Sequence, residues 1–210
     1  MNAVGRGGTP LIAAAGRWPN EVKELLDAKA DPNVADSSGS TPLLAAVCQR
    51  QLESAKLLLA AGANPNATSP AMESPLGVAV RTANLDMVTL LLHPPIDVNA
   101  ENARGQTPLH ILAWWCNPGD AQVCTAIAQM LINFGAKRNA LDQQGQTAAD
   151  IALNKGMTDL ASVIAGRKLT ATRRAGPQIP VQFGPRPWPI PIPIPSAPPP
   201  MSTTTSGSYR

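Results

Sequence analysis

The sequence is poor in aromatic residues and lacks long apolar runs, and both shortages limit what the protein can be. Its 210 residues include one Tyr, two Phe and four Trp. No uninterrupted apolar stretch follows the polar opening MNAVGRGG, which argues against a secretory signal and a membrane span. Three cysteines, Cys48, Cys116 and Cys124, form an odd number without the spacing of a disulfide framework. We therefore expect a reducing compartment, with the cytoplasm as the default location.

Residues suited to catalysis or metal binding are also scarce. Of the two histidines, His93 precedes a proline pair, and neither His93 nor His110 is spaced to face a nucleophile or a carboxylate. His110, Cys116 and Cys124 can be imagined as zinc ligands, but no paired Cys spacing supports a metal site over structural or free thiols. No Gly-rich phosphate loop follows a predicted strand. We expect no enzyme, no cofactor, no metal and no small-molecule substrate.

The C-terminal part of the chain lacks acidic residues altogether. After Ala165 there are six basic residues, whereas the preceding part holds the other 11 Lys and Arg and all 14 Asp and Glu. Eleven of the 22 prolines lie between Pro177 and Pro200. With almost no amphipathic periodicity, this part cannot bury enough apolar surface to offset its ordering entropy. We predict a disordered tail over residues 167–210.

What the sequence does contain is an internal repeat with three markers in one phase. The first marker is a Thr or Ser that opens a short apolar segment: TPLIAA at Thr9, TPLLAA at Thr41, SPLGVA at Ser74, TPLHIL at Thr107 and TAADIA at Thr147. The intervals between these residues are 32, 33, 33 and 40. An Asn precedes each following Thr or Ser by eight residues, and LLD, LLL, LLL or MLI precedes each Asn. The spacing predicts five repeat units.

Each unit predicts a pair of helices. A hydroxyl N-cap followed by proline at the first helical position begins the first helix. Small residues that let neighbouring helices approach lie five positions after the Thr or Ser, at Ala14, Ala46, Ala79 and Ala152. Gly62 and Gly135 lie where the second helix must end, and Asn, Asp and Gly then predict a projecting hairpin. One pair cannot bury its apolar face alone, so the units must stack.

These residues resemble an ankyrin repeat array, whose consensus has TPLH in the first helix, a Leu triplet in the second and Gly-Ala-Asp-Val-Asn before the finger. The resemblance covers Thr9 to about Ala165 and implies an all-α solenoid of stacked helix pairs with projecting β-hairpin-like fingers. It also implies that the imidazole of His110 braces neighbouring backbone. Lys29 departs from the family's Gly, and Asp150 in the last unit departs from its His, as a solubilising end cap requires.

The fourth unit departs most from the pattern. Leu112 takes the position that is Ala in the other four units, and seven residues are inserted around WWCNPGDAQVC. Asn117 to Gly119 predict a turn, and Asp120 is placed to cap a lengthened second helix. The apolar residues of that helix follow helical spacing: Val123, Ile127, Met130, Leu131 and Phe134.

Trp114 and Trp115 fall where the resemblance places variable, partner-facing positions on a concave side. The equivalent residues elsewhere are Cys48, Gln49, Arg81 and Thr82. Consecutive helical residues diverge by about 100°, so at least one Trp must be accessible. Two interpretations remain open: one Trp fills space beside Leu112 while the other lies on the insertion, or the pair anchors a partner, as Trp often does at interfaces.

The tail admits interpretations of a different class. RAGPQIP, with Arg174, Pro177 and Pro180, fits a basic residue followed by a PxxP core, the polyproline II pattern that aromatic grooves bind. A spacer or a solvated extension is the other interpretation. A basic cluster around Arg173 lacks interleaved aromatic residues, so nucleic-acid binding is not expected.

Together these features predict an N-terminal extension (1–8), an ankyrin repeat domain (9–166) and a tail (167–210). By resemblance, a monomeric array binds an unidentified partner protein through its concave face and finger tips. The alternative is an adaptor whose tail recruits a partner with a polyproline-binding groove. The expected contact residues are Ser37, Ser38, Ser40, Pro70, Ala71, Glu73, Arg81, Ala103, Arg104, Gln106, Trp114, Trp115, Gln143, Gln144 and Gln146. The finger asparagines Asn66 and Asn99 are expected to fix turns rather than to contact a partner.

Overall fold

The computed structural model describes residues 8–68, 73–93 and 96–169, and it shows five consecutive helix pairs. The first helices of the pairs are α1 (Pro10–Ala15), α3 (Pro42–Cys48), α5 (Pro75–Arg81), α7 (Pro108–Trp115) and α9 (Ala148–Asn154). The second helices are α2 (Pro19–Asp27), α4 (Leu52–Ala60), α6 (Leu85–Leu91), α8 (Ala121–Asn133) and α10 (Thr158–Ala165). The predicted helix pair is therefore confirmed in all five units.

Each first helix begins at the residue that the repeat predicts. The hydroxyl oxygens of Thr9, Thr41 and Ser74 each accept a hydrogen bond from the amide three residues later. Thr147 does the same and also donates to the Asp150 carboxylate, so the last unit has a capping box. These contacts satisfy amides that have no partner within the helix, which is why the helices begin there.

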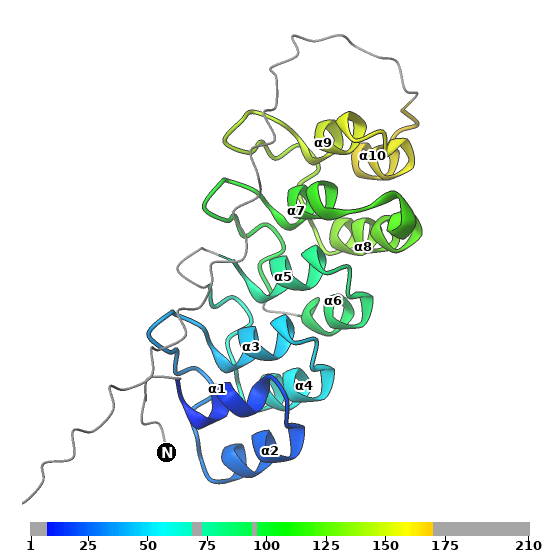
Figure 1. Ribbon diagram of the computed structural model, residues 1–210. Coiled ribbons are helices and arrows are strands. Elements are labelled where there is room, and N and C mark those ends of the chain that lie inside the picture. The colour runs from blue at the N-terminus through cyan, green and yellow to red at the C-terminus, as the bar shows by residue number, and fades with distance from the viewer. Residues whose placement is uncertain (1–7, 69–72, 94–95, 170–210) are drawn as a thin grey trace, which may run out of the picture. The chain divides into compact units, whose positions relative to one another are not determined.

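The units stack helix on helix, as Figure 1 shows. Each first helix contacts the first helix of the next unit, and each second helix contacts the next second helix. The small residues predicted for close approach are buried at Ala14, Ala46, Ala79 and Ala152. In unit 4 the equivalent Leu112 is buried as well. A continuous apolar core therefore runs through the stack, and each unit depends on its neighbours for burial.

The fingers between pairs are tight turns rather than β-hairpins. Over the ranges that the structure describes, the backbone forms no strand, only a bridge residue at Gly8. In three fingers, the residue at Asp36, Asn102 or Asp142 donates its amide to a carbonyl four residues later and accepts two amides on its side chain. The β-hairpin-like prediction is correct for the turn, but these residues form no ladder.

The finger asparagines were expected to fix turns, and the backbone that their side chains bind belongs to the following unit. Asn33 Nδ2 donates to Gly62 O, and its Oδ1 accepts the amide of Asn64. Asn99 binds Gly135 O and the amide of Lys137 in the same way, and Asn66 Oδ1 accepts the amide of Asp97. These side chains satisfy backbone groups of the following unit, so they fix the fingers in place.

Candidate partner-binding surface

A row of side chains lies at the C-terminal ends of the first helices of units 2 to 5, and we call it the helix-end row. Its members are Cys48, Gln49, Arg81, Thr82, Trp114, Trp115 and Lys155. Trp114 is 38% exposed and Trp115 is 51% exposed. Both indoles therefore reach the surface, and neither is buried in the core beside Leu112. Exposed large apolar side chains of this kind are candidates for a contact surface.

Arg81 connects the middle of the helix-end row. Its guanidinium lies 5.8 Å from the centre of the Trp115 ring, and its Nη2 lies 3.3 Å from Glu73 Oε2. Over the described residues, the buried Nε of Arg81 finds no hydrogen-bond partner. Stacking of a cation on an aromatic face orients both groups. Arg81 therefore ties α5 to the exposed Trp115 of α7 and presents them as one patch.

The charges of Arg81 and Glu73 act on the free thiol of Cys48, which lies in the same row. Burial raises the pKa of Cys48, the Arg81 cation lowers it, Glu73 raises it, and the net pKa lies above the ordinary value. The thiol therefore stays protonated at neutral pH. It is therefore a weak nucleophile, because reactivity requires the thiolate.

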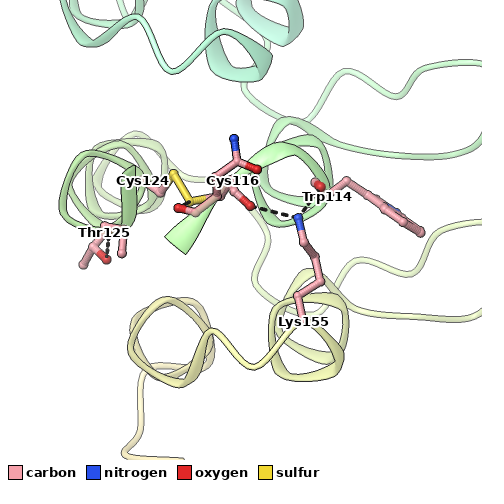
Figure 2. Close-up of a disulfide and its surroundings, with 7 residues drawn as sticks. Trp114, Cys116, Cys124, Thr125 and Lys155 are labelled. Carbon is pink, nitrogen blue, oxygen red and sulfur yellow. Dashed lines mark hydrogen bonds between the residues drawn. A yellow bond between two sulfur atoms is a disulfide. The ribbon is translucent and has the colours of Figure 1, made fainter. Parts of the chain in front are cut away.

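A disulfide closes the corner where the row passes through unit 4. Cys116 and Cys124 are bonded, with their Cα atoms 6.2 Å apart, and both are buried. Figure 2 shows the bond between the end of α7 and the start of α8, with the Lys155 side chain reaching the same corner. Lys155 Nζ donates to the carbonyls of Trp114 and Cys116, the latter at 2.9 Å. Partial burial lowers the pKa of Lys155.

The disulfide was not predicted, because the three cysteines lack the spacing of a disulfide framework. Two of the three are paired, and Cys48 is the free one. The argument for a reducing compartment loses that support, and the cytoplasmic location stays a prediction. Their pairing also removes the thiolates of the imagined zinc site with His110. Among the described residues, no group of three or more His, Cys, Asp or Glu side chains is arranged to hold a metal.

Comparison with known families decides what the stack is. The model for ankyrin repeats in three copies matches residues 1–69 and 76–173. The chain belongs to the ankyrin repeat family. A comparison with curated proteins found no match. Within the ankyrin pattern, the helix-end row occupies the positions expected to face a partner. Through the described ranges, no helix is long and apolar enough to cross a membrane.

The ankyrin TPLH histidine braces the next unit, as the resemblance implies. His110 Nδ1 accepts the amide of Thr107, and its Nε2 lies 3.1 Å from Gln146 O. Nε2 therefore carries the proton and donates to that carbonyl. His110 is buried, so its role is to hold the finger between units 4 and 5 rather than to carry out chemistry.

The finger residues expected to make contacts divide by burial. The exposed ones are Ser37, Ser38, Ala103, Arg104, Gln143 and Gln144. Ser40 and Gln146 are half-buried. Gln106 is buried, and its Oε1 accepts a hydrogen bond from Asn102 Nδ2, so its side chain stabilises the turn and does not belong to the surface. Gln143 also donates to Ala103 O in the adjacent finger. Pro70 and Ala71 lie outside the described residues.

One exposed feature was not predicted from the sequence. A hollow of about 520 Å³ lies on the open side of unit 1 and is lined partly by Pro10, Ala13, Trp18 and Leu25. Pro10 is exposed, whereas the equivalent Pro42 and its counterparts in units 3 and 4 are buried. The hollow thus lies on a face of unit 1 whose counterpart is covered in units 2 to 4. Trp18, which lies between α1 and α2 and is half exposed, is the residue that marks this face in the sequence.

The predicted segments on either side of the repeats lie largely outside the described residues. The N-terminal extension lies almost wholly outside the described residues. The tail motif with Arg174, Pro177 and Pro180 also lies outside them. The candidate surface is therefore built from the helix-end row and the exposed finger turns.

Proposed function

We propose that this ankyrin array binds a partner protein through the helix-end row and the finger turns, with Trp114 and Trp115 as its anchors. Ankyrin repeats are generally protein–protein interaction modules, and they are typically non-catalytic. The observation that carries the proposal is the double exposure of the tryptophans on a rigid helix end. Trp side chains on an ordered scaffold lose little entropy on binding, which favours them as energetic centres of an interface.

The surroundings of the tryptophans support this choice. Arg81 lies over the indole of Trp115 and is paired with Glu73, so a partner meets an apolar centre with a charged group at its edge. This arrangement is typical of protein interfaces, in which aromatic and arginine side chains concentrate the binding energy. The partner residue best suited to the centre is apolar or aromatic.

The experiment is a pull-down from cell lysate with four baits. They are the full-length chain, residues 1–166, a Trp114→Ala/Trp115→Ala variant, and a Trp18→Ala variant as the matched control. Circular dichroism establishes that each bait is folded. We expect residues 1–166 and the Trp18 variant to retain the partner, and the double variant to lose it by more than about fivefold in affinity.

The second candidate is an adaptor that works through its proline-rich tail. The composition of residues 167–200 favours it, because PxxP segments bind aromatic grooves as preformed polyproline II helices. If residues 1–166 capture nothing while the double Trp variant captures normally, the tail is the functional segment and the helix-end proposal is wrong.

A further inference from the structure

The two bonded cysteines enclose the segment that unit 4 has in excess of the other units. Between them lie residues 117–123, which include the short 3-10 helix η1 (Pro118–Asp120) and the first turn of α8. Cys116 immediately follows Trp115 and terminates α7, whereas Cys124 lies within α8 and is fully buried. The disulfide therefore joins the end of the anchor helix to the core of the next helix.

Units 2, 3 and 5 close the same corner with a backbone turn. In units 2, 3 and 5, a residue with positive φ turns the chain: Arg50, Ala83 or Gly156. The next amide then donates to a carbonyl five residues earlier, as Gln51 does to Ala46. In unit 4, Cys116 instead continues in an extended conformation, with φ −61° and ψ 134°. In unit 4, a disulfide that a reductant can open therefore takes the place of the backbone turn of units 2, 3 and 5.

We propose that the Cys116–Cys124 disulfide is a redox-sensitive clamp on the partner-binding surface, and that reducing it weakens binding through Trp114 and Trp115. This inference rests on the proposed function and assigns a means of regulation to the same site. The oxidised chain, in which the corner is closed, is the binding-competent form.

The chemistry requires a dithiol reductant. Its thiolate attacks Cys116 Sγ, the sulfur of the less deeply buried cysteine, and the S–S bond breaks with Cys124 leaving as a thiolate that takes up a proton. The second thiol of the reductant then attacks the mixed disulfide and releases Cys116 as a thiol. The protein gains two electrons and two protons, and the dithiol becomes a disulfide. The segment over the bond is exposed from Asn117 to Asp120, so local opening admits the reductant.

Opening the bond acts on the tryptophans through Cys116. Two separate thiols require van der Waals separation, and Cys124 is fixed inside α8 by complete burial. The displacement therefore falls on Cys116, whose neighbours on the C-terminal side are exposed. Lys155 binds the carbonyls of both Trp114 and Cys116 with one ammonium group, so movement of Cys116 also disturbs the last turn of α7. The stacking of Arg81 on Trp115 depends on that turn.

The test compares four full-length proteins with and without dithiothreitol. They are the wild type, Cys48→Ser, Cys116→Ser/Cys124→Ser, and Trp114→Ala/Trp115→Ala. Cys48→Ser removes the free thiol and leaves the pair intact, and it is compared only with itself, with and without dithiothreitol, because Cys48 belongs to the helix-end row. Alkylation followed by mass spectrometry counts the free thiols in each sample. The probe for binding is the protein species that the oxidised wild type captures and the double Trp variant does not.

Indole N–H signals from 15N-labelled tryptophan provide a readout that needs no partner. We expect dithiothreitol to shift the Trp114 and Trp115 signals, to leave Trp18 in place, and to weaken capture by about fivefold or more in the wild type and Cys48→Ser. The Cys116→Ser/Cys124→Ser protein should behave as reduced in both conditions.

Three results would overturn the clamp. They are a pair that stays oxidised in dithiothreitol without denaturant, indole signals that do not move when both thiols are free, and capture that is unchanged after complete reduction. If the Cys116→Ser/Cys124→Ser protein does not fold, the reduced wild type carries the test. If the double Trp variant captures the partner normally, the proposed function fails. Indole signals that shift in the reduced wild type then support a redox-sensitive clamp on α7 without a role in binding.

Discussion

Unit 2 and unit 4 join their two helices in different ways. In unit 2 three residues separate α3 from α4, and the turn is closed by the left-handed Arg50 and by the amide of Gln51, which donates to Ala46 O. In unit 4 five residues separate α7 from α8, and a disulfide with a bridging Lys155 closes it. The larger joint places two tryptophans at a surface where unit 2 has Cys48 and Gln49. A repeat array can thus change one unit locally, because each unit contacts only its neighbours.

The largest expected effect comes from the buried residue that distinguishes unit 4. Leu112→Ala restores the residue type of the other units but leaves a cavity, since α8 and its surroundings have packed around the Leu. We expect the free energy of unfolding to fall by about 2–5 kcal/mol. Chemical denaturation of the oxidised protein measures it. A change below about 1 kcal/mol would show that the helices close up as in unit 2 and that Leu112 is no special feature.

The disulfide should contribute the next largest effect. In Cys116→Ser/Cys124→Ser, the unfolded chain regains the freedom of a short loop, which corresponds to about 2–3 kcal/mol of stability in the chain-entropy treatment. Urea unfolding under oxidising conditions gives the difference, and the same comparison in dithiothreitol is the control. Equal stability of wild type and variant when both are oxidised would mean that the bond stabilises nothing.

A smaller effect, in the opposite direction, is expected at the end of the second helix of unit 1. Lys29 is exposed and has φ 65°, whereas units 2 and 4 have Gly62 and Gly135 with positive φ at this position. Lys29→Gly should relieve the left-handed strain and raise the free energy of unfolding by about 1 kcal/mol. Thermal or urea unfolding measures the gain, and Lys23→Gly inside α2 is a control that should destabilise instead.

The smallest expected effect is on the pH dependence of stability. It concerns Asp36, whose counterpart in another finger is Asn102. Burial of Asp36 raises its pKa, but hydrogen bonds from the Ser38 hydroxyl and the amides of Ser40 and Ser38 outweigh this, and the pKa lies below its ordinary value of 3.8. Because the folded pKa is depressed, the carboxylate stabilises the fold above pH 3.8, and this contribution is lost as the pH falls through the folded pKa.

Asp36→Asn gives this finger the residue type that the finger between units 3 and 4 has at Asn102. We expect nearly unchanged stability at pH 7, because the Asn oxygen can accept the same amides, and a flatter loss of stability as the pH falls below 3.8. Unfolding followed as a function of pH measures both. An identical acid profile for the two proteins would show that Asp36 does not contribute to acid sensitivity.

The sequence predicted the regular part of this molecule because the markers act locally. Thr9 and its counterparts cap helices through amides three residues away, and small residues such as Ala46 govern contact between neighbouring helices. His110 and Asn99 were also assigned correctly, since their roles depend on the repeat itself. Periodic structure therefore follows from periodic sequence.

The irregular part could not be predicted in the same way. Cys116 and Cys124 approach each other only because the inserted turn brings α8 back against α7, and their spacing resembles no disulfide framework. Gln106 is buried and bonds with Asn102 in its own turn, and the repeat pattern does not predict that contact. The hollow at Trp18 is lined by Pro10, whose counterparts in units 2 to 4 are buried. Each of these features depends on contacts outside the repeat pattern.

Site-specific photo-crosslinking is the measurement that tests the account most directly. A benzophenone amino acid replaces Trp115 in one full-length protein and Trp18 in another, and each is irradiated in cell lysate under oxidising conditions. The account predicts one dominant crosslinked protein at position 115 that is absent at position 18. Crosslinking of the same protein only at position 18, or equally at both positions, would contradict a binding surface centred on the helix-end row.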